Sequence, residues 1–225
     1  MHAPTAPFSE QLRDGTRGVH QETESAPFVG ALMSGAVDAR GYAALLGQLH
    51  HVYSALEDPH AAVVQDPVLA PFQSAALHRC AALAADLRAL LGDDWQGLCP
   101  PLPATLRYRD RIAEVAAHWP GGFVAHHYTR YLGDLSGGQA LRVAVQRHLD
   151  LPDGVGTSFF VFEAIDSPKR FKDHYRRALD TAPWDDEERE RIVAEARRAF
   201  VHNGELFADL WQHLAGQPSA EVVLP

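Results

Sequence analysis

A glycine-rich stretch, YLGDLSGGQ from Tyr131 to Gln139, is the most unusual local feature of the sequence. Gly133, Gly137 and Gly138 fall within six residues of a segment whose flanks have helical periodicity. Each glycine inside a helix costs about 1 kcal/mol relative to alanine. A kinked helix that brings bare backbone against a flat ligand would explain this cost. A loop between two helices, or close helix–helix packing, would explain it too.

His20 is the candidate metal ligand among the thirteen histidines. It borders an apolar stripe of the expected first helix, and Glu24 follows one turn later on the same face. A carboxylate there can accept the hydrogen on Nδ1 and leave Nε2 free to bind a metal. An ordinary His–Glu pair on a helix surface has the same spacing, so the spacing alone leaves both interpretations open.

Basic residues cluster in the sequence although its formal net charge is −9. Arg13 and Arg17 precede His20 by two turns and one turn of the expected first helix. A second basic cluster on a later helix contains Lys169, Arg170, Lys172, Arg176 and Arg177. Solvated helix faces commonly carry such runs, but a dianionic ligand needs the same charges at the rim of its pocket.

Other site chemistries lack their motifs. The glycine-rich stretch has neither GxGxxG nor the Lys-Ser/Thr pair of a P-loop. A di-iron centre needs two Glu-x-x-His motifs, whereas only Glu57 and His60 have that spacing and Pro59 interrupts their helix. Cys80 and Cys99 have no CxxC spacing, which indicates reduced, structural thiols of the kind found in cytosolic proteins.

The pattern of apolar residues is helical almost throughout and predicts an all-α fold. The expected helix N-caps are Ser9, Asp38, Ser167 and Asp185. Pro59 should bend or end the second helix, and a third should follow Pro71 and stop at Gly92. A long helix from Phe123 to about Leu149 carries the glycine-rich stretch. Only Ser158–Ile165 resembles a strand, and it has no partner.

Length and composition fit one domain, which we place at residues 1–216, with a loose tail over 217–225. The acidic balance argues against nucleic-acid binding, which needs a basic face. No apolar run approaches the ~20 residues of a membrane span. The opening residues, MHAPTAPFSEQ, lack the features of a secretory signal. We therefore expect a cytoplasmic protein without a membrane span.

Five segments together resemble the heme oxygenase family, and the similarity covers nearly the whole chain. The most specific is AHHYTRYLGDLSGGQ, from Ala125 to Gln139, which resembles the family signature almost letter for letter. The others, in the family's order and spacing, are RDGTRGVHQETES around His20, LHHVYSALE, FKDHYRR and AFVHNGELF. The resemblance implies a single-domain helical fold in which heme is sandwiched between a proximal helix and a kinked, glycine-rich distal helix.

The resemblance also implies roles for individual residues. His20 matches the proximal ligand of the heme iron, and Glu24 matches its hydrogen-bonding partner. Asp134 matches the distal carboxylate that orders water beside the bound oxygen. The residues matching distal glycines that approach the heme are Gly133, Gly137 and Gly138.

Two further groups of residues match the family. Tyr53, Arg130 and Asn203 match a hydrogen-bond network around the distal site. The residues matching groups that hold the heme propionates are Arg13, Tyr128, Lys172 and Arg176. Arg13 and Arg17 stand where some relatives have lysines, which keeps the charge but changes its geometry. His127 replaces a small residue of the signature, and its role cannot be derived from the sequence.

The activity implied is cleavage of heme b, by oxygen and reducing equivalents, to biliverdin of the IX-alpha type, carbon monoxide and Fe²⁺. Heme is then both substrate and cofactor, and the chain has no flavin or nicotinamide motif of its own. An external donor, either a ferredoxin or a flavoprotein reductase, is therefore expected, and a bilin-using protein could take the product. Two alternatives remain: a heme-storage protein on the same fold, and a thiaminase-like hydrolase with a nucleophilic cysteine.

Overall fold

Helices account for nearly all regular structure in the computed structural model, which describes residues 6–58, 65–152 and 154–216. No β-strand occurs in these ranges, so the predicted all-α fold is confirmed and Ser158–Ile165 forms no strand. The α-helices are α1 (Phe8–Glu24), α2 (Pro27–Ser34), α3 (Ala39–Glu57), α5 (Cys80–Leu91), α6 (Trp95–Leu98), α7 (Pro103–His118), α8 (Pro120–His127), α9 (Gly133–His148), α10 (Pro168–Thr181) and α11 (Asp186–Ala215). The short segments are η1 (Ala75–Leu77), η2 (Tyr128–Leu132) and η3 (Ser158–Phe160).

Three of the four expected N-caps are confirmed. The carboxylates of Asp38 and Asp185 accept from the amides of Gly41 and Glu188, and the hydroxyl of Ser167 accepts from that of Arg170. The prediction for Ser9 is wrong. The extended backbone of Pro7 starts α1 at Phe8, so Ser9 lies in the first turn, where its amide donates to Asp180 Oδ1 at 2.8 Å.

The boundaries between Glu57 and Leu91 differ from the expected ones. Helix α3 ends at Glu57, and Pro59 lies outside the described residues. The expected third helix does not follow Pro71 directly. A turn of 3₁₀ helix at Ala75–Leu77 comes first and α5 begins only at Cys80, ending as expected at Gly92, whose φ of 84° suits glycine.

The predicted long helix around the glycine-rich stretch is present as α8, η2 and α9, which follow one another without a break. Its irregularity lies just before the glycines: η2 (Tyr128–Leu132) is a π-helical segment. A π-helical turn holds one residue more than an α-helical turn and rotates the side chains that follow it. The same helix can therefore turn Tyr128 toward one face and keep Arg130 and Tyr131 buried.

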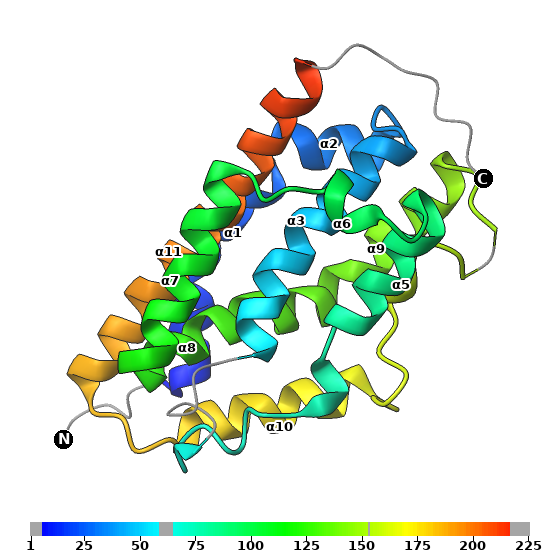
Figure 1. The fold of residues 1–225 in the computed structure, drawn as a ribbon. Coiled ribbons are helices and arrows are strands. Elements are labelled where there is room, and N and C mark those ends of the chain that lie inside the picture. Colours follow the sequence, from blue (N-terminus) through cyan, green and yellow to red (C-terminus); the bar gives the residue numbers. More distant parts are fainter. Residues whose placement is uncertain (1–5, 59–64, 153, 217–225) are drawn as a thin grey trace.

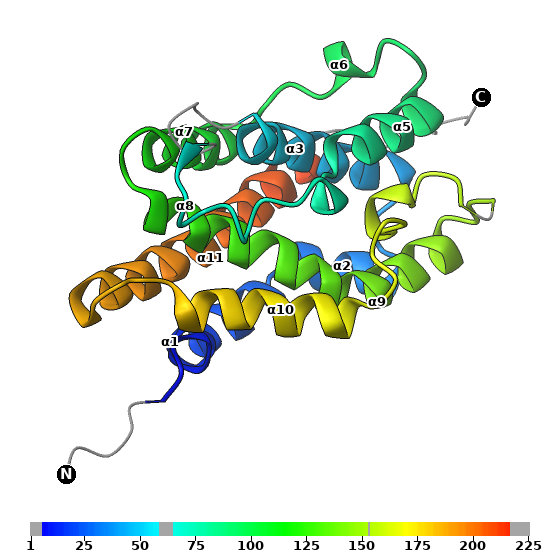
Figure 2. The same cartoon turned by 90° about the horizontal axis from the view of Figure 1, so that it is seen from below.

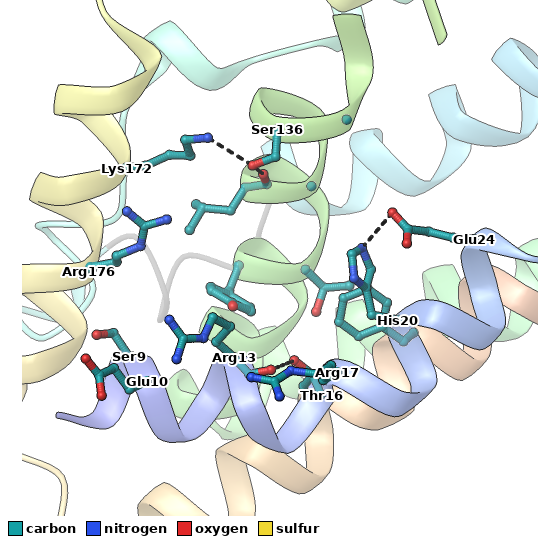
Figure 3. Close-up of a pocket in the computed structure, with 16 residues that line it drawn as sticks. Ser9, Glu10, Arg13, Thr16, Arg17, His20, Glu24, Ser136, Lys172 and Arg176 are labelled. Carbon is teal, nitrogen blue, oxygen red and sulfur yellow. Dashed lines mark hydrogen bonds and ion pairs between the residues drawn. The ribbon is translucent and has the colours of Figure 1, made fainter. Parts of the chain in front are cut away.

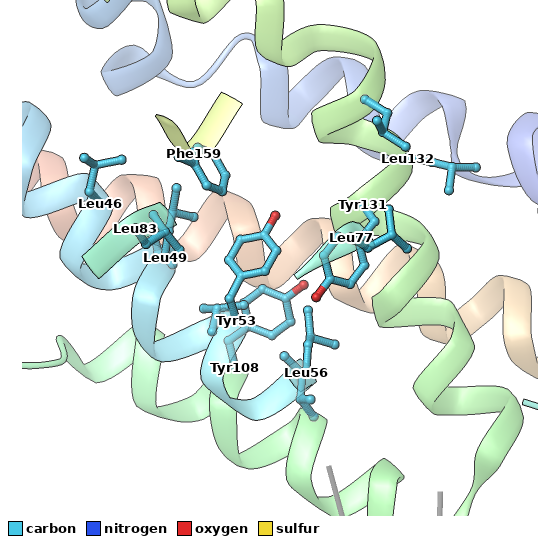
Figure 4. Close-up of a cluster of buried hydrophobic side chains, with 14 of the residues drawn as sticks. Leu46, Leu49, Tyr53, Leu56, Leu77, Leu83, Tyr108, Tyr131, Leu132 and Phe159 are labelled. Carbon is cyan, nitrogen blue, oxygen red and sulfur yellow. The ribbon is translucent and has the colours of Figure 1, made fainter. Parts of the chain in front are cut away.

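Two groups of helices enclose the core (Figures 1 and 2). Helix α3 packs against α5 and α7, and the long α11 packs against α1, α7 and α8. Helix α8–η2–α9 runs between these groups, and α10 lies beside α1. The buried side chains between them are mainly leucines and aromatic rings, with Tyr53, Tyr108 and Tyr131 at the centre (Figure 4).

Three further predictions concern the cysteines, membrane-spanning helices and the C-terminal tail. Cys80 and Cys99 are free cysteines, as predicted. Within the described ranges, no helix combines the length and apolar character that a membrane crossing would require. The predicted loose tail over 217–225 lies outside the described residues.

Candidate active site

A cavity of about 790 Å³ lies between α1 on one side and η2 and α9 on the other (Figure 3). Helix α10 contributes Lys172 and Arg176 to its rim, and α11 contributes Phe200. Eight predicted site residues line it: Arg13, His20, Glu24, Tyr128, Gly133, Gly137, Lys172 and Arg176. Residues far apart in the sequence thus meet at one site.

His20 forms the α1 side of the cavity. Its ring packs edge-on against Phe200, with the ring centroids 5.0 Å apart. Its Nε2 atom lies 3.4 Å from Glu24 Oε1, so the predicted pair exists, but the nitrogen involved is the opposite of the one expected. A half-turn of the ring about the Cβ–Cγ bond redirects Nε2, and nearly half of the side chain is exposed, which leaves room for that turn.

The rim of the cavity is cationic. Arg13 and Arg17 flank Asp14, with Arg13 Nε 3.0 Å from Asp14 Oδ1. Across the cavity, Lys172 Nζ donates to Ser136 Oγ at 3.1 Å. Tyr128 is partly buried between the two sides: burial raises the pKa of its hydroxyl, and the guanidinium groups of Arg176 and Arg13 lower it. The rim can therefore receive an anionic group from either side.

The glycines form the opposite wall. A β-carbon built at Gly133 or Gly137 would have no other atom within 4 Å, apart from its own helix backbone and chain neighbours. Both glycines line the cavity, so this open space is the cavity itself. Gly138 differs from the prediction, because it does not line the cavity and its β-carbon would meet Phe160 Cδ1 at 3.3 Å. Two glycines thus present bare backbone to the cavity, and the third permits helix–loop packing.

A polar network stands behind this wall. The Tyr53 hydroxyl donates a short hydrogen bond to Asp134 Oδ2. Arg130 donates from Nε and Nη2 to the Tyr53 oxygen at 3.2 and 3.1 Å, and from Nη2 to Asp134 Oδ1 at 3.4 Å. It also donates from Nη1 to Asn203 Oδ1 at 2.7 Å. The structure therefore brings Asp134, predicted as the distal carboxylate, together with the three residues predicted for the network around it, one layer behind the cavity wall.

Burial dominates the electrostatics of this network. It raises the pKa of the Asp134 carboxyl, although Arg130 and the hydrogen bond from Tyr53 lower it. It also raises the pKa of the Tyr53 hydroxyl well above its usual value. Tyr53 thus stays a proton donor, and Asp134 binds a proton more readily than a carboxylate in water.

The heme oxygenase family model matches residues 6–209 of this chain. The chain belongs to the heme oxygenase family. It is 41% identical to heme oxygenase 1 of Rattus norvegicus over 205 residues, which cover 90% of this chain and 71% of the rat protein. Identity to heme oxygenase 1 of Synechocystis is also 41%, over 203 residues that cover 90% of this chain and 84% of that protein.

Solved structures of the family have the same fold. The crystal structure of heme oxygenase-1 from Synechocystis in complex with heme superposes with a TM-score of 0.88 at 40% identity, covering 93% of this chain and 95% of that chain. Heme oxygenase-2 from the same cyanobacterium, in complex with heme and NO, gives a TM-score of 0.86 at 36% identity, covering 93% and 87%. The expected fold and family are both confirmed.

The cavity suits the substrate of a heme oxygenase. A flat macrocycle needs a wall without side chains, which Gly133 and Gly137 provide. Its iron needs a ligand on the opposite face, where His20 lies. Its two propionates need cations at the edge, where Arg13, Lys172 and other basic residues stand.

Sequence reasoning missed several residues that line the cavity. Ser136 and Phe200 line the cavity, and both fall inside segments that carried the family resemblance, so position on the helix face could have found them. His127, unexplained by the sequence, is buried and its Nδ1 lies 3.0 Å from the Tyr175 hydroxyl. Burial lowers the pKa of His127 to about 3, so it is a neutral packing residue that joins α8 to α10.

Proposed function

We propose that this protein binds heme b as its substrate in the α1–α9 cavity and cleaves it to biliverdin, carbon monoxide and Fe²⁺. The observation that carries the proposal is the pairing of His20 on one cavity wall with the side-chain-free wall of Gly133 and Gly137 on the other. Bound heme supplies the iron that activates dioxygen, and its own ring is opened. The matched region and the fold support one heme oxygenase domain, which we take as residues 1–216.

His20 would hold the iron through Nε2, and Glu24 would fix the ring by accepting the hydrogen on Nδ1. This arrangement requires the half-turn of the imidazole described above, since Nε2 now lies beside Glu24. Glu24 is mostly exposed and can follow the ring, so the pair can re-form around the other nitrogen. A neutral imidazole ligand favours reversible oxygen binding, as in globins.

Asp134 would orient water on the distal side. It does not line the cavity, and both of its oxygens are engaged, by Tyr53 and by Arg130. A carboxylate held one layer behind the wall acts on the cavity through water more readily than by direct contact. Its raised pKa suits a group that delivers protons.

Arg13, Tyr128, Lys172 and Arg176 would hold the two propionates and so fix the rotation of the ring. That rotation decides which meso carbon lies beneath the distal wall, and we expect the alpha position, giving biliverdin IX-alpha. Because Gly133 and Gly137 leave backbone alone on that wall, its shape is set by the helix and not by side chains.

Oxygen and electrons must come from outside the chain. We propose that a ferredoxin or a flavoprotein reductase docks at the basic edge of the cavity, where α10 carries Lys169, Arg170, Lys172, Arg176 and Arg177. A bilin-using protein could take the product. A cytoplasmic location is consistent with the two free cysteines.

The decisive experiment adds one equivalent of hemin to the purified protein, follows the Soret band and then adds ascorbate in air. Loss of the Soret band with release of biliverdin and carbon monoxide supports the proposal, and His20→Ala is the matched negative variant. A stable heme complex that yields no bilin, with ascorbate or with a ferredoxin–reductase system, would favour heme storage instead. Failure to bind heme would overturn the proposal.

The hydrolase alternative finds no support at the cysteines. Burial, together with nearby Glu57, raises the pKa of the Cys80 thiol to about 12. Burial also raises the pKa of the Cys99 thiol. Neither sulfur lines the cavity, and neither forms the thiolate that a nucleophilic mechanism requires.

A further inference from the structure

Residues 156–162, which include the short η3, form an irregular segment between α9 and α10. The segment packs against α5 and α9 through η3. Side chains from other elements hold its backbone. At its start, the hydroxyl of Tyr42 from α3 donates to the carbonyl oxygen of Gly156 at 2.7 Å. Two charged side chains, Asp86 of α5 and Arg79 just before α5, hold the rest.

Both of these charged residues are buried, with only 1% of Asp86 and 6% of Arg79 exposed. The Asp86 carboxylate accepts from the amide of Ser158 at 2.8 Å and from that of Phe159 at 2.7 Å. The Arg79 guanidinium donates from Nη1 to the carbonyl oxygens of Phe159 at 3.3 Å and Val161 at 2.5 Å. The main chain of Phe159 therefore lies between a negative and a positive charge, with its N–H toward Asp86 and its C=O toward Arg79.

This arrangement makes the 156–162 segment rigid. A buried charge is costly unless hydrogen bonds compensate it, and here peptide groups of the segment do so. Burial raises the pKa of Asp86, while the bonds from the amides of Phe159 and Ser158 favour its ionised form. Moving the segment would take hydrogen bonds from two buried charges at once, which costs more than breaking bonds between neutral groups.

The inner side of the 156–162 segment contacts α9 directly behind the cavity wall. The Phe160 ring lies so close to Gly138 that a β-carbon there would meet Phe160 Cδ1 at 3.3 Å. The carbonyl oxygen of Phe160 accepts from Gln139 Nε2 at 2.9 Å. Gly137, the residue before these two, lines the cavity. Helix α9 thus has the cavity on one side and the segment on the other.

The same segment also contacts the distal network. The ring of Phe159 packs edge-on against that of Tyr53, with the centroids 5.5 Å apart (Figure 4). Tyr53 in turn donates to Asp134. One rigid segment therefore touches both the helix that forms the wall and the tyrosine that holds Asp134.

We propose that Asp86 and Arg79 are positioning residues that clamp the 156–162 segment as a fixed support behind α9, and so set the width of the cavity opposite His20. A π-helical turn and glycines are the usual places where a helix bends, and α9 follows one and contains the other. Such a helix needs an external support to keep its distance from α1. The support is a property of the heme-free protein, whereas its effect on heme cleavage rests on the proposed function.

Amide hydrogen exchange of the heme-free protein tests the support, with Asp86→Asn compared with Asp209→Asn. Asp209 accepts from the amide of Ala104 at 2.7 Å, so the control also loses a carboxylate bonded to the main chain, but away from the segment. Asp86→Asn should speed exchange about tenfold at the amides of Ser158 and Phe159 and at residues 137–141 of α9, as expected for one lost hydrogen bond to a charged group. Asp209→Asn should leave exchange in α9 unchanged. Faster exchange in the segment with unchanged exchange in α9 would overturn the proposal.

Gln139→Ala provides a second test that does not disturb a buried charge. Gln139 is an exposed residue of α9, so its truncation leaves the core intact and removes only the direct bond to Phe160. Exchange at residues 137–141 should again be faster than in wild type. Wild-type exchange there in Gln139→Ala would contradict the support, even if Asp86→Asn failed to fold.

The effect on the site is read from heme affinity and from the products. A wall that can move away from α1 holds the heme ring less closely and in more than one position. Asp86→Asn and Gln139→Ala should therefore bind heme about threefold to tenfold more weakly and release a second biliverdin isomer. A protein that was only less stable would release less of the same isomer.

Two results separate the support from the proposed function. A single isomer and wild-type heme affinity in both variants would refute the role of Asp86 and Arg79 in setting the cavity width. Absence of heme turnover in wild type, together with faster exchange of α9 in the variants, would refute only the proposed function.

Discussion

Gly137→Ala separates the stability of the heme-free protein from its affinity for heme. The added methyl group meets no atom within 4 Å outside its own helix backbone and chain neighbours, so the folded structure accepts it without rearrangement. Alanine is favoured over glycine in a helix interior by about 1 kcal/mol. For a domain of this size, that gain corresponds to a rise in melting temperature of about 2–4 °C.

The same methyl group would occupy space that heme requires in the proposed site. Pressing an extra carbon into a filled site costs about 1–3 kcal/mol, which would weaken heme binding about 5-fold to 150-fold. Gly30→Ala is the matched control, because Gly30 lies inside α2, away from the cavity, and its β-carbon also meets nothing within 4 Å. Thermal melts of the heme-free proteins and hemin titrations followed at the Soret band measure both effects.

Both variants should gain stability, and only Gly137→Ala should lose affinity. If Gly137→Ala bound heme as tightly as Gly30→Ala, the backbone of α9 would not touch the ligand, and the argument from the open glycine wall would fail.

Asp134→Ala should keep heme binding and lose biliverdin formation in the ascorbate assay; unchanged turnover would remove Asp134 from the mechanism. His20→Ala should lose the axial ligand, and a native-like heme spectrum in that variant would contradict the assignment. Lys172→Ala should weaken heme binding about twofold to fivefold, the range of one exposed ion pair, with the effect shrinking at high salt in hemin titrations. Folding lowers the pKa of His127 from 6.5 to about 3, so burial of its neutral ring contributes fully to the free energy of unfolding above pH 6.5. This contribution is lost as the pH falls from 6.5 toward 3, because the unfolded chain then binds a proton at His127 that the folded protein does not. Urea unfolding near neutral pH and at about pH 4.5 should show a smaller loss of stability in His127→Phe than in wild type; equal losses would show that another buried group controls the acid response.

Helix content and most capping positions could be predicted from the sequence, because apolar periodicity and cap residues act locally. Ser9 shows the limit of this approach. Serine commonly caps helices, but α1 begins at Phe8, two residues before the start that a Ser9 cap would give, and the amide of Ser9 is satisfied by Asp180, 171 positions away. The residues around Ser9 in the sequence therefore could not have revealed Asp180 as the partner of its amide.

Many residues of the cavity and of the network behind it could be predicted from the sequence, but their geometry could not. The residues of the network were expected, but the side of the helix that each glycine faces depends on the π-helical turn at Tyr128–Leu132, which has no sequence signal of its own. Gly138 packs on Phe160 and does not line the cavity, because neighbouring residues of an α-helix such as Gly137 and Gly138 point about 100° apart. The nitrogen of His20 nearest Glu24 is likewise decided by ring orientation, which residue spacing does not determine.

The cations at the rim of the cavity already have partners. Arg13 pairs with Asp14, Arg176 pairs with Asp173 at 2.9 Å, and Lys172 bonds to Ser136. A ligand carboxylate that binds at the rim must therefore compete for these cations with Asp14, Asp173 and Ser136. When the carboxylate leaves, the same three groups can pair with the cations again. Such an exchange would keep the guanidinium groups of Arg13 and Arg176 paired with a carboxylate both before the ligand binds and after it leaves. It suits an enzyme that must hold a flat dianion through several oxidations and then let an altered, open-chain dianion go.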